Sequence, residues 1–131
     1  MTTQANGTFE VTMTPQATFD NAPGATLSRL SLSKQFRGDL NGSSAGEMLA
    51  ARTEIADSAG YVAIERVTGT LHGRTGSFVL QHSGIVTRGK QSLTIHVVPD
   101  SGTGELKGIS GQMAIIIVAG AHSYEFTYTL P

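Results

Sequence analysis

The stretch Gly38-Asp39-Leu40-Asn41-Gly42 recurs with changes as Gly69-Thr70-Leu71-His72-Gly73 and again as Gly104-Glu105-Leu106-Lys107-Gly108. In each copy an apolar residue follows the leucine after seven or eight positions: Met48, Phe78 and Met113. Glycine supplies the positive φ angles that tight chain reversals need. Each copy therefore predicts the end of one strand, a turn and the start of a returning strand, so the chain is expected to be a series of related β-hairpins.

The rest of the sequence also favours strands. Apolar and polar residues alternate with a period of two between clusters of Gly, Pro, Asn and Asp, and no segment has sustained helical periodicity with caps at both ends. We predict about eight strands, at residues 8–15, 27–40, 46–55, 61–71, 77–87, 91–98, 105–118 and 122–130. The connection over residues 16–26 contains Pro23-Gly24 and is expected to hold a short helix or to cover one end of the fold.

The expected topology follows from the edges of such a sheet. An antiparallel meander has two edge strands, and closing it into a barrel removes both of them. A chain of 131 residues is long enough for one domain with its own core, and no linker divides it. The sequence therefore predicts an all-β fold, a single eight-stranded antiparallel β-barrel over residues 1–131.

Composition excludes several classes of function. The net charge is −1 and the basic residues are scattered, so the chain has no footprint for nucleic acid or for an anionic membrane surface. It has no cysteine and no closely spaced pair of histidines, so we expect neither a metal nor another cofactor. The N-terminus has no signal-peptide pattern, and the longest apolar run, residues 113–121, is too short to span a membrane. We therefore expect a cytoplasmic protein.

Alternation also assigns the faces of the strands. If the turn at residues 72–75 has four residues, Gly69 lies opposite Phe78 and Glu65 lies opposite His82, both on the inner face. The same reasoning places three further polar side chains inside: Lys34, Arg52 and Tyr124. Burying an unpaired charge is costly. These groups must therefore form pairs, line a wet cavity or take their neutral forms.

Two interpretations of the inner polar groups stay open. In the first, a carboxylate beside an imidazole within an apolar wall is an acid–base site, because burial and nearby charges tune such groups. In the second, Glu65 bridges Lys34 or Arg52 inside a filled barrel and serves stability alone. An eight-stranded barrel has room for packed side chains or for one small ligand.

The first interpretation defines candidate site residues. Glu65 would be the general acid or base with His82 as its partner, while Tyr124 and Lys34 would stabilise a developing oxyanion. The candidate substrate-binding residues are other inward side chains: Arg52, Tyr61, Phe78, Leu80 and Phe126.

Other motifs carry less chemistry. Gly42-Ser43-Ser44-Ala45-Gly46 has the spelling of a nucleophile elbow, which needs a strand, a sharp turn and a helix. Here the segment is expected to be the turn of the first hairpin, so Ser44 is not expected to be a nucleophile. His72 in a turn and His96 between apolar neighbours are expected at the surface, whereas His122 opens the last strand and could line a barrel mouth.

Several segments carry a resemblance to a known family. They are Gly60-Tyr61-Val62-Ala63-Ile64-Glu65-Arg66-Val67, Gly76-Ser77-Phe78-Val79-Leu80-Gln81-His82 and residues 34–40, 98–106 and 122–126. Together they resemble a bacterial family of small uncharacterised proteins of the domain-of-unknown-function type, over nearly the whole chain. The resemblance implies an allene oxide cyclase-like barrel, a shape shared with plant allene oxide cyclases and dirigent proteins. Those relatives guide cyclisation or coupling of reactive intermediates in an apolar barrel, usually as oligomers.

Two functions therefore stay open for this barrel. One is a cyclase or isomerase that acts on a small hydrophobic molecule in the interior. The other is a non-catalytic module that binds such a molecule or a protein partner. The analogy with the cyclases rests on the fold, since no cyclase motif maps onto this chain residue by residue. Apolar residues at outward positions, among them Val62, Ile64 and Ile85, also lead us to expect a homo-oligomer.

Overall fold

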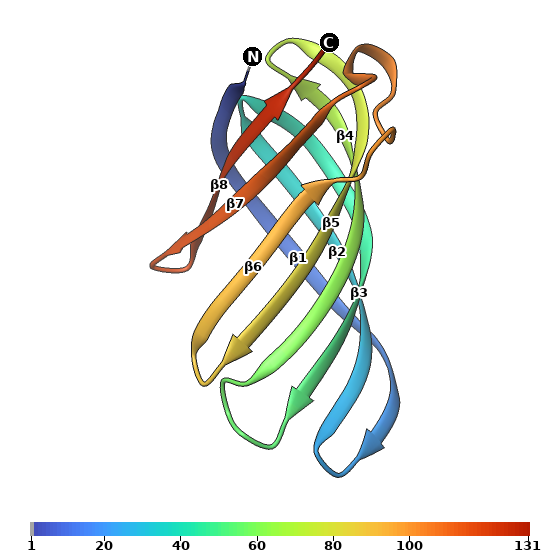
Figure 1. The fold of residues 1–131 in the computed structure, drawn as a ribbon, viewed down its shortest axis with the longest axis vertical. Helices are drawn as coiled ribbons and strands as arrows, with labels where there is room; N and C mark the ends of the chain where they lie inside the picture. The colour runs from blue at the N-terminus through green and yellow to red at the C-terminus, as the bar shows by residue number, and fades with distance from the viewer. Residues whose placement is uncertain (1) are drawn as a thin grey trace.

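The computed structural model describes residues 2–131, and most of them lie in antiparallel strands that form one closed barrel (Figure 1). The strands follow chain order: β1 (Thr3–Ala22), β2 (Ala25–Gly38), β3 (Leu40–Thr53), β4 (Ala59–Leu71), β5 (Arg74–Thr87), β6 (Lys90–Val97), β7 (Ser110–Val118) and β8 (Ala121–Thr129). Each pairs with its chain neighbour, and β8 pairs with β1 to close the circle. The predicted all-β barrel of eight antiparallel strands is confirmed.

The first strand is much longer than predicted. β1 continues to Ala22, and the chain reverses at Pro23-Gly24, so the helix or end cover expected over residues 16–26 is wrong. Two register shifts bend β1 beyond Pro15, between Pro15 and Ala17 and between Thr18 and Asp20. Pairing with β8 stops at Phe9, which leaves Pro15 on a free edge. A proline is tolerated there because its missing N–H removes no ladder hydrogen bond.

The three copies of the glycine pattern differ in structure. In the first, the chain reverses around Asp39, and residues 42–46 lie within β3 instead of forming the turn. In the second, His72 and Gly73 form a two-residue turn with φ angles of 46° and 82°. In the third, Gly104–Leu106 is a 3-10 turn that buries Leu106, and the strand predicted from residue 105 begins only at Ser110. The hairpin prediction is therefore wrong for the third copy.

The short turn between β4 and β5 sets a register that differs by two residues from the prediction. Glu65 lies opposite Leu80, and His82 lies opposite Ala63. Side chains alternate with a period of two, so an even shift keeps each of them on its predicted face. Glu65 and His82 accordingly both face inward, with exposed fractions of 0% and 3%.

The barrel has one packed half and one open half. The packed half, at the top of Figure 1, contains a cluster of aromatic side chains in which Phe78 and Phe126 stack with ring centroids 5.5 Å apart. In the other half the strands separate, because β6 and β7 share the single pair His96–Gln112 and β8 leaves β1 beyond the pair Phe9–His122. The β7–β8 hairpin therefore stands apart from its neighbours.

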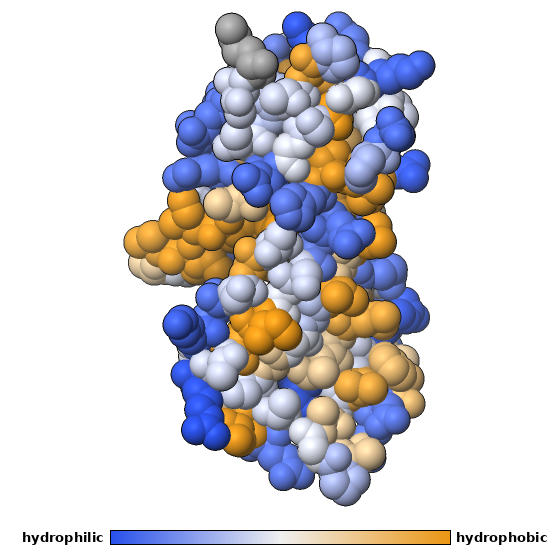
Figure 2. All heavy atoms as spheres, viewed as in Figure 1, coloured by the Kyte–Doolittle hydropathy of each residue, from blue (hydrophilic) through white to orange (hydrophobic). Residues whose placement is uncertain are grey.

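Exposed apolar side chains include two groups on the barrel surface. The tip of the β7–β8 hairpin protrudes on the left of Figure 2, and Ile117 and Val118 are 57% and 67% exposed. The outer face of β3 to β5 carries Leu49, Val62, Ile64 and Ile85. The expected homo-oligomer stays a prediction, which light scattering at high concentration would test. Within residues 2–131, no helix has the length and apolar character needed to cross a membrane.

Tyr124 connects β8 to the reversal between β2 and β3, and this contact generates a stability prediction. Its hydroxyl accepts a hydrogen bond from the Leu40 N–H at 2.9 Å and lies 3.0 Å from the Arg37 carbonyl oxygen. Tyr124→Phe leaves the buried Leu40 N–H without this partner, which should cost about 1–3 kcal/mol in urea unfolding. Tyr61→Phe is a matched control that should change stability little. An unchanged unfolding midpoint for Tyr124→Phe would contradict the assigned contact.

Candidate functional site

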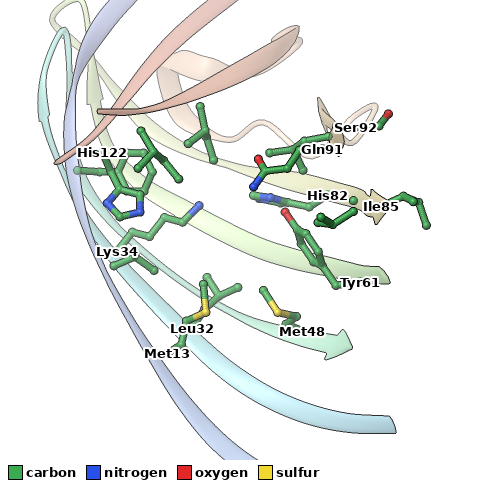
Figure 3. A pocket seen from close by; sticks show the side chains of 17 residues that line it. Met13, Leu32, Lys34, Met48, Tyr61, His82, Ile85, Gln91, Ser92 and His122 are labelled. Carbon is green, nitrogen blue, oxygen red and sulfur yellow. The ribbon is translucent and has the colours of Figure 1, made fainter. Parts of the chain in front are cut away.

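A cavity of about 210 Å³ occupies the open half of the barrel (Figure 3). Its walls are mainly apolar and come from most of the strands, with Val11, Leu32, Met48, Val86 and Ile115 among the lining side chains. A cavity of roughly 150 Å³ is known to hold benzene. The volume is therefore suitable for a six-membered ring with a few substituent atoms.

Polar side chains converge on one region of this apolar cavity. Lys34, Tyr61, His82 and Gln91 line it, and their polar ends point toward one another in Figure 3. The tyrosine fits because residue 84 on the neighbouring strand is glycine, where a Cβ atom would overlap the Tyr61 ring. Burial, followed by the negative charge of Glu65, raises the pKa of Tyr61, so its hydroxyl is a hydrogen-bond donor at neutral pH.

Glu65 lies behind Lys34 and His82 and does not line the cavity. Its Oε2 atom is 2.9 Å from the Lys34 Nζ atom and 3.0 Å from the His82 Nε2 atom. These are ion-pair distances, although neither approach has the angles of a well-formed hydrogen bond, and within residues 2–131 Oε1 also has no hydrogen-bond partner. We call Lys34, Glu65 and His82 the charged cluster.

Small residues on β3 make the charged cluster possible. Lys34 is on β2 and Glu65 is on β4, so the lysine side chain must cross β3 to reach the carboxylate. The residues that β3 places inward beside them are Ser44, opposite Lys34, and Gly46, opposite Glu65. A Cβ atom at residue 46 would lie only 2.6 Å from the Glu65 Cα atom. The Gly42–Ser44–Gly46 alternation thus provides space for an ion pair and forms no nucleophile elbow.

The charged cluster keeps its carboxylate ionised. Burial raises the pKa of Glu65, but contact with His82 and the positive charge of Lys34 lower it, and the net shift is downward. The lysine ammonium also lies 5.0 Å from the centre of the Phe9 ring, which is within the range of a cation–π interaction. The cluster therefore combines a fixed negative charge in the wall with a cation and an imidazole at the cavity surface.

The structure brings together three of the four predicted catalytic residues. Lys34, Glu65 and His82 meet in the charged cluster, whereas Tyr124 lies in the packed half, where its hydroxyl is bound to backbone groups. Glu65 has no access to the cavity, so any direct contact with a ligand falls to Lys34 or His82.

Among the predicted substrate-binding residues, Tyr61 lines the cavity and the others do not. Phe78, Leu80 and Phe126 belong to the packed core. Arg52 is exposed near the end of β3, where an inward position already reaches solvent. Alternation separates the inner face from the outer one, but it does not give a residue's height along the barrel axis, and that height decides which side chains line the cavity.

Sequence reasoning missed Met13 and Gln91 in the cavity wall. Alternation could have placed both residues inside. Met13 shares a strand face with Phe9 and Val11, and Gln91 shares one with the buried Ile95 and Val97. Met13 lies inside the strand predicted at residues 8–15, and its place in the wall depends on its height along the barrel axis, which alternation does not give.

The remaining histidines have separate environments. His72 lies in its predicted turn and its Nδ1 atom is 2.5 Å from the Tyr128 hydroxyl, while His96 is exposed as predicted. His122 lines the cavity and its ring lies against Phe9. The part of the chain that the structure describes contains no group of three or more His, Cys, Asp or Glu side chains arranged to hold a metal ion.

The charged cluster predicts a double-mutant result. Lys34→Met leaves a buried carboxylate with only His82 beside it and should cost about 3–5 kcal/mol of unfolding free energy. Adding Glu65→Gln removes that charge, so the double variant should be less destabilised than the sum of the two single variants. Arg29→Met is the control, because it breaks an exposed ion pair with Glu47 and should cost less than about 1 kcal/mol. Additive single effects would contradict an interaction between Lys34 and Glu65.

Glu65 also predicts how stability depends on pH. Its pKa in the folded protein lies below the ordinary value of 4.5, so its ionisation contributes stability above that pH, and the contribution is lost as the pH falls through the folded pKa. The difference in unfolding free energy between wild type and Glu65→Gln should be constant near neutral pH and shrink below pH 4.5. Chemical denaturation between pH 7 and pH 3 measures this difference in unfolding free energy. A difference that grows as the pH falls would contradict a lowered pKa for Glu65.

Comparisons with known proteins place the chain in a family without assigning it an activity. Residues 5–128 match the model of a family described as "Protein of unknown function (DUF3224)". Among solved structures, the chain is similar to a protein with unknown function from the DUF3224 family of Shewanella oneidensis MR-1, whose crystal structure has a resolution of 1.84 Å. The two are 49% identical with a TM-score of 0.96, and the match covers 100% of this chain and 98% of that one. No curated protein matches.

Proposed function

Because the chain belongs to the DUF3224 family of proteins of unknown function, we propose its function from the cavity itself. The barrel binds a small, mainly apolar molecule that carries one polar group. The observation that supports this most directly is the cavity of about 210 Å³, which has apolar walls and a few convergent polar side chains. That combination is typical of small-molecule sites, in which apolar area contributes affinity and a few polar groups fix orientation.

The alternative of a filled barrel explains less of the geometry. A purely structural ion pair would be enclosed by packed side chains, since protein interiors leave few voids larger than a water molecule. Here Lys34 and His82, although buried from bulk solvent, line the cavity, and Glu65 does not. The ion pair therefore has a structural part, the buried carboxylate, and a part that is available to a ligand.

Adjacent residues on β3 provide a matched test of binding. Met48 lines the cavity and Leu49 lies on the outer face of the same strand. Cyclohexylmethanol is a suitable probe because its ring and side arm match the cavity volume. Titration followed by NMR should show binding to wild type and to Leu49→Trp, and at least tenfold weaker binding to Met48→Trp, whose indole fills the cavity. Equal loss in both variants, or no binding to wild type, contradicts the proposed function.

One observation favours a catalytic role as a second candidate. The His82 Nε2 atom faces the ionised Glu65 carboxylate at 3.0 Å, an arrangement that orients an imidazole for proton transfer through its other nitrogen. Lys34 and Tyr61 would donate hydrogen bonds to a developing oxyanion. The site would then serve a cyclase or isomerase that moves a proton next to a carbonyl group. The resemblance to allene oxide cyclase-like barrels adds an analogy of fold.

In this candidate reaction His82 would be the acid–base group and Glu65 its positioning residue. A ketone that fits the cavity, cyclohexyl methyl ketone, allows a test without knowledge of the natural substrate. In deuterated water, NMR should show faster exchange of its α-hydrogens in the presence of the protein. His82→Gln should reduce the protein-dependent rate by about two to four orders of magnitude. His96→Gln, which changes an exposed histidine, should leave that rate unaltered, and equal rates for wild type and His82→Gln would exclude the role.

A further inference from the structure

Among the polar groups at the cavity surface, Lys34 and Tyr61 supply donors and His82 supplies an acceptor, while the Gln91 amide and the Ser92 hydroxyl can do either. Lys34 carries a cationic ammonium group with three N–H donors, and the Tyr61 hydroxyl is a further donor. His82 differs, because its Nε2 atom faces the Glu65 carboxylate and that contact favours the tautomer with the proton on Nε2. The Nδ1 atom of that tautomer has a free lone pair. A ligand that satisfies Lys34, Tyr61 and His82 must therefore accept hydrogen bonds on one atom and donate one from another.

The charges of the cluster restrict the ligand further. Glu65 and Lys34 form a buried pair whose charges cancel, with the atoms 2.9 Å apart. An anion that entered this apolar cavity alone would leave one uncompensated negative charge, which is costly away from water. A proton that entered with the anion would restore neutrality, and the Nδ1 atom of His82 is the site that can take or share it.

We propose that the cavity binds a small monocarboxylic acid, and that each carboxylate taken from neutral solution enters together with one proton. This inference rests on the proposed binding function. One carboxyl oxygen accepts hydrogen bonds from Lys34 and Tyr61, and the proton lies between the other oxygen and the Nδ1 atom of His82. The proton comes from the solvent. The number of protons taken up is therefore one, whether the complex is a carboxylic acid with imidazole or a carboxylate with imidazolium.

The surroundings of His82 identify the group that takes the proton. The titratable groups near it are Glu65 and Tyr61 from β4 and Lys34 from β2, and His122 from β8 lines the same cavity. The side chains that β1, β3, β6 and β7 contribute to this cavity are not titratable. Glu65 is already ionised and Tyr61 already protonated at neutral pH, which leaves the two histidines, and only His82 contacts the buried carboxylate.

Three probes with the same ring distinguish binding of a carboxylate with proton uptake from binding of any small apolar molecule. They are cyclohexanecarboxylate, cyclohexyl methyl ketone and cyclohexylmethanol. Isothermal titration calorimetry at pH 7 in phosphate and in Tris measures proton uptake, because the two buffers differ in ionisation enthalpy. We expect the carboxylate to bind at least tenfold more tightly than the alcohol and to take up about one proton. The affinity for the carboxylate should fall by about tenfold for each unit that the pH rises, over the pH range in which binding takes up one full proton. The ketone and the alcohol should bind without proton uptake.

Histidine variants locate the proton. His82→Gln should abolish proton uptake, while His122→Gln, in the same cavity, and His96→Gln, at the surface, should retain it. Because His82 contacts Glu65, its variant can lose stability, and the buffer comparison on wild type decides the main claim without it. If all three probes bind alike without proton uptake, the monocarboxylate inference is overturned and the binding function stands. If none binds, the binding function itself fails.

Discussion

The contact of one buried carboxylate with a lysine and a histidine lies where the packed half of this barrel meets the open half. Above the charged cluster the interior is filled by stacked aromatic rings, and below it the interior is open. Glu65 is fully enclosed, so its charge requires partners inside the protein, and Lys34 and His82 supply them from two other strands. The same two side chains then face the cavity. The enclosed Glu65 carboxylate is thus in contact with two side chains that line the cavity.

The strand between the partners is as important as the partners themselves. An inward side chain of ordinary size at residue 44 or 46 would separate Lys34 from Glu65, since β3 lies between their strands. Serine and glycine at these positions leave the space open. Gly84 has the same relation to Tyr61, whose ring occupies the place of an absent Cβ atom. Glycine in this barrel therefore serves the interior as well as the turns, because its small size admits large polar side chains from adjacent strands.

The sequence predicted the features that depend on alternation. It failed for the position of a residue along the barrel axis and for the ends of strands. Period-two alternation placed Glu65 and His82 inside despite a turn of the wrong length, because an even register error preserves the face. It could not place Tyr124 and Arg52 along the barrel axis, and they lie outside the cavity wall. Pro15 concealed the second half of β1, since a proline ends a central strand but not a free edge. The third glycine segment became a 3-10 turn, a result that its similarity to the other two did not reveal.

The separation of β6 from β7 changes what closes the wall of the barrel beside the cavity. Along most of the wall, passage between neighbouring strands would break a continuous ladder of backbone hydrogen bonds. Between β6 and β7 the pairing is limited to His96 and Gln112, and residues from both strands line the cavity just beyond that pair. Beside the cavity, contact between β6 and β7 therefore depends on side chains and not on a ladder of backbone hydrogen bonds.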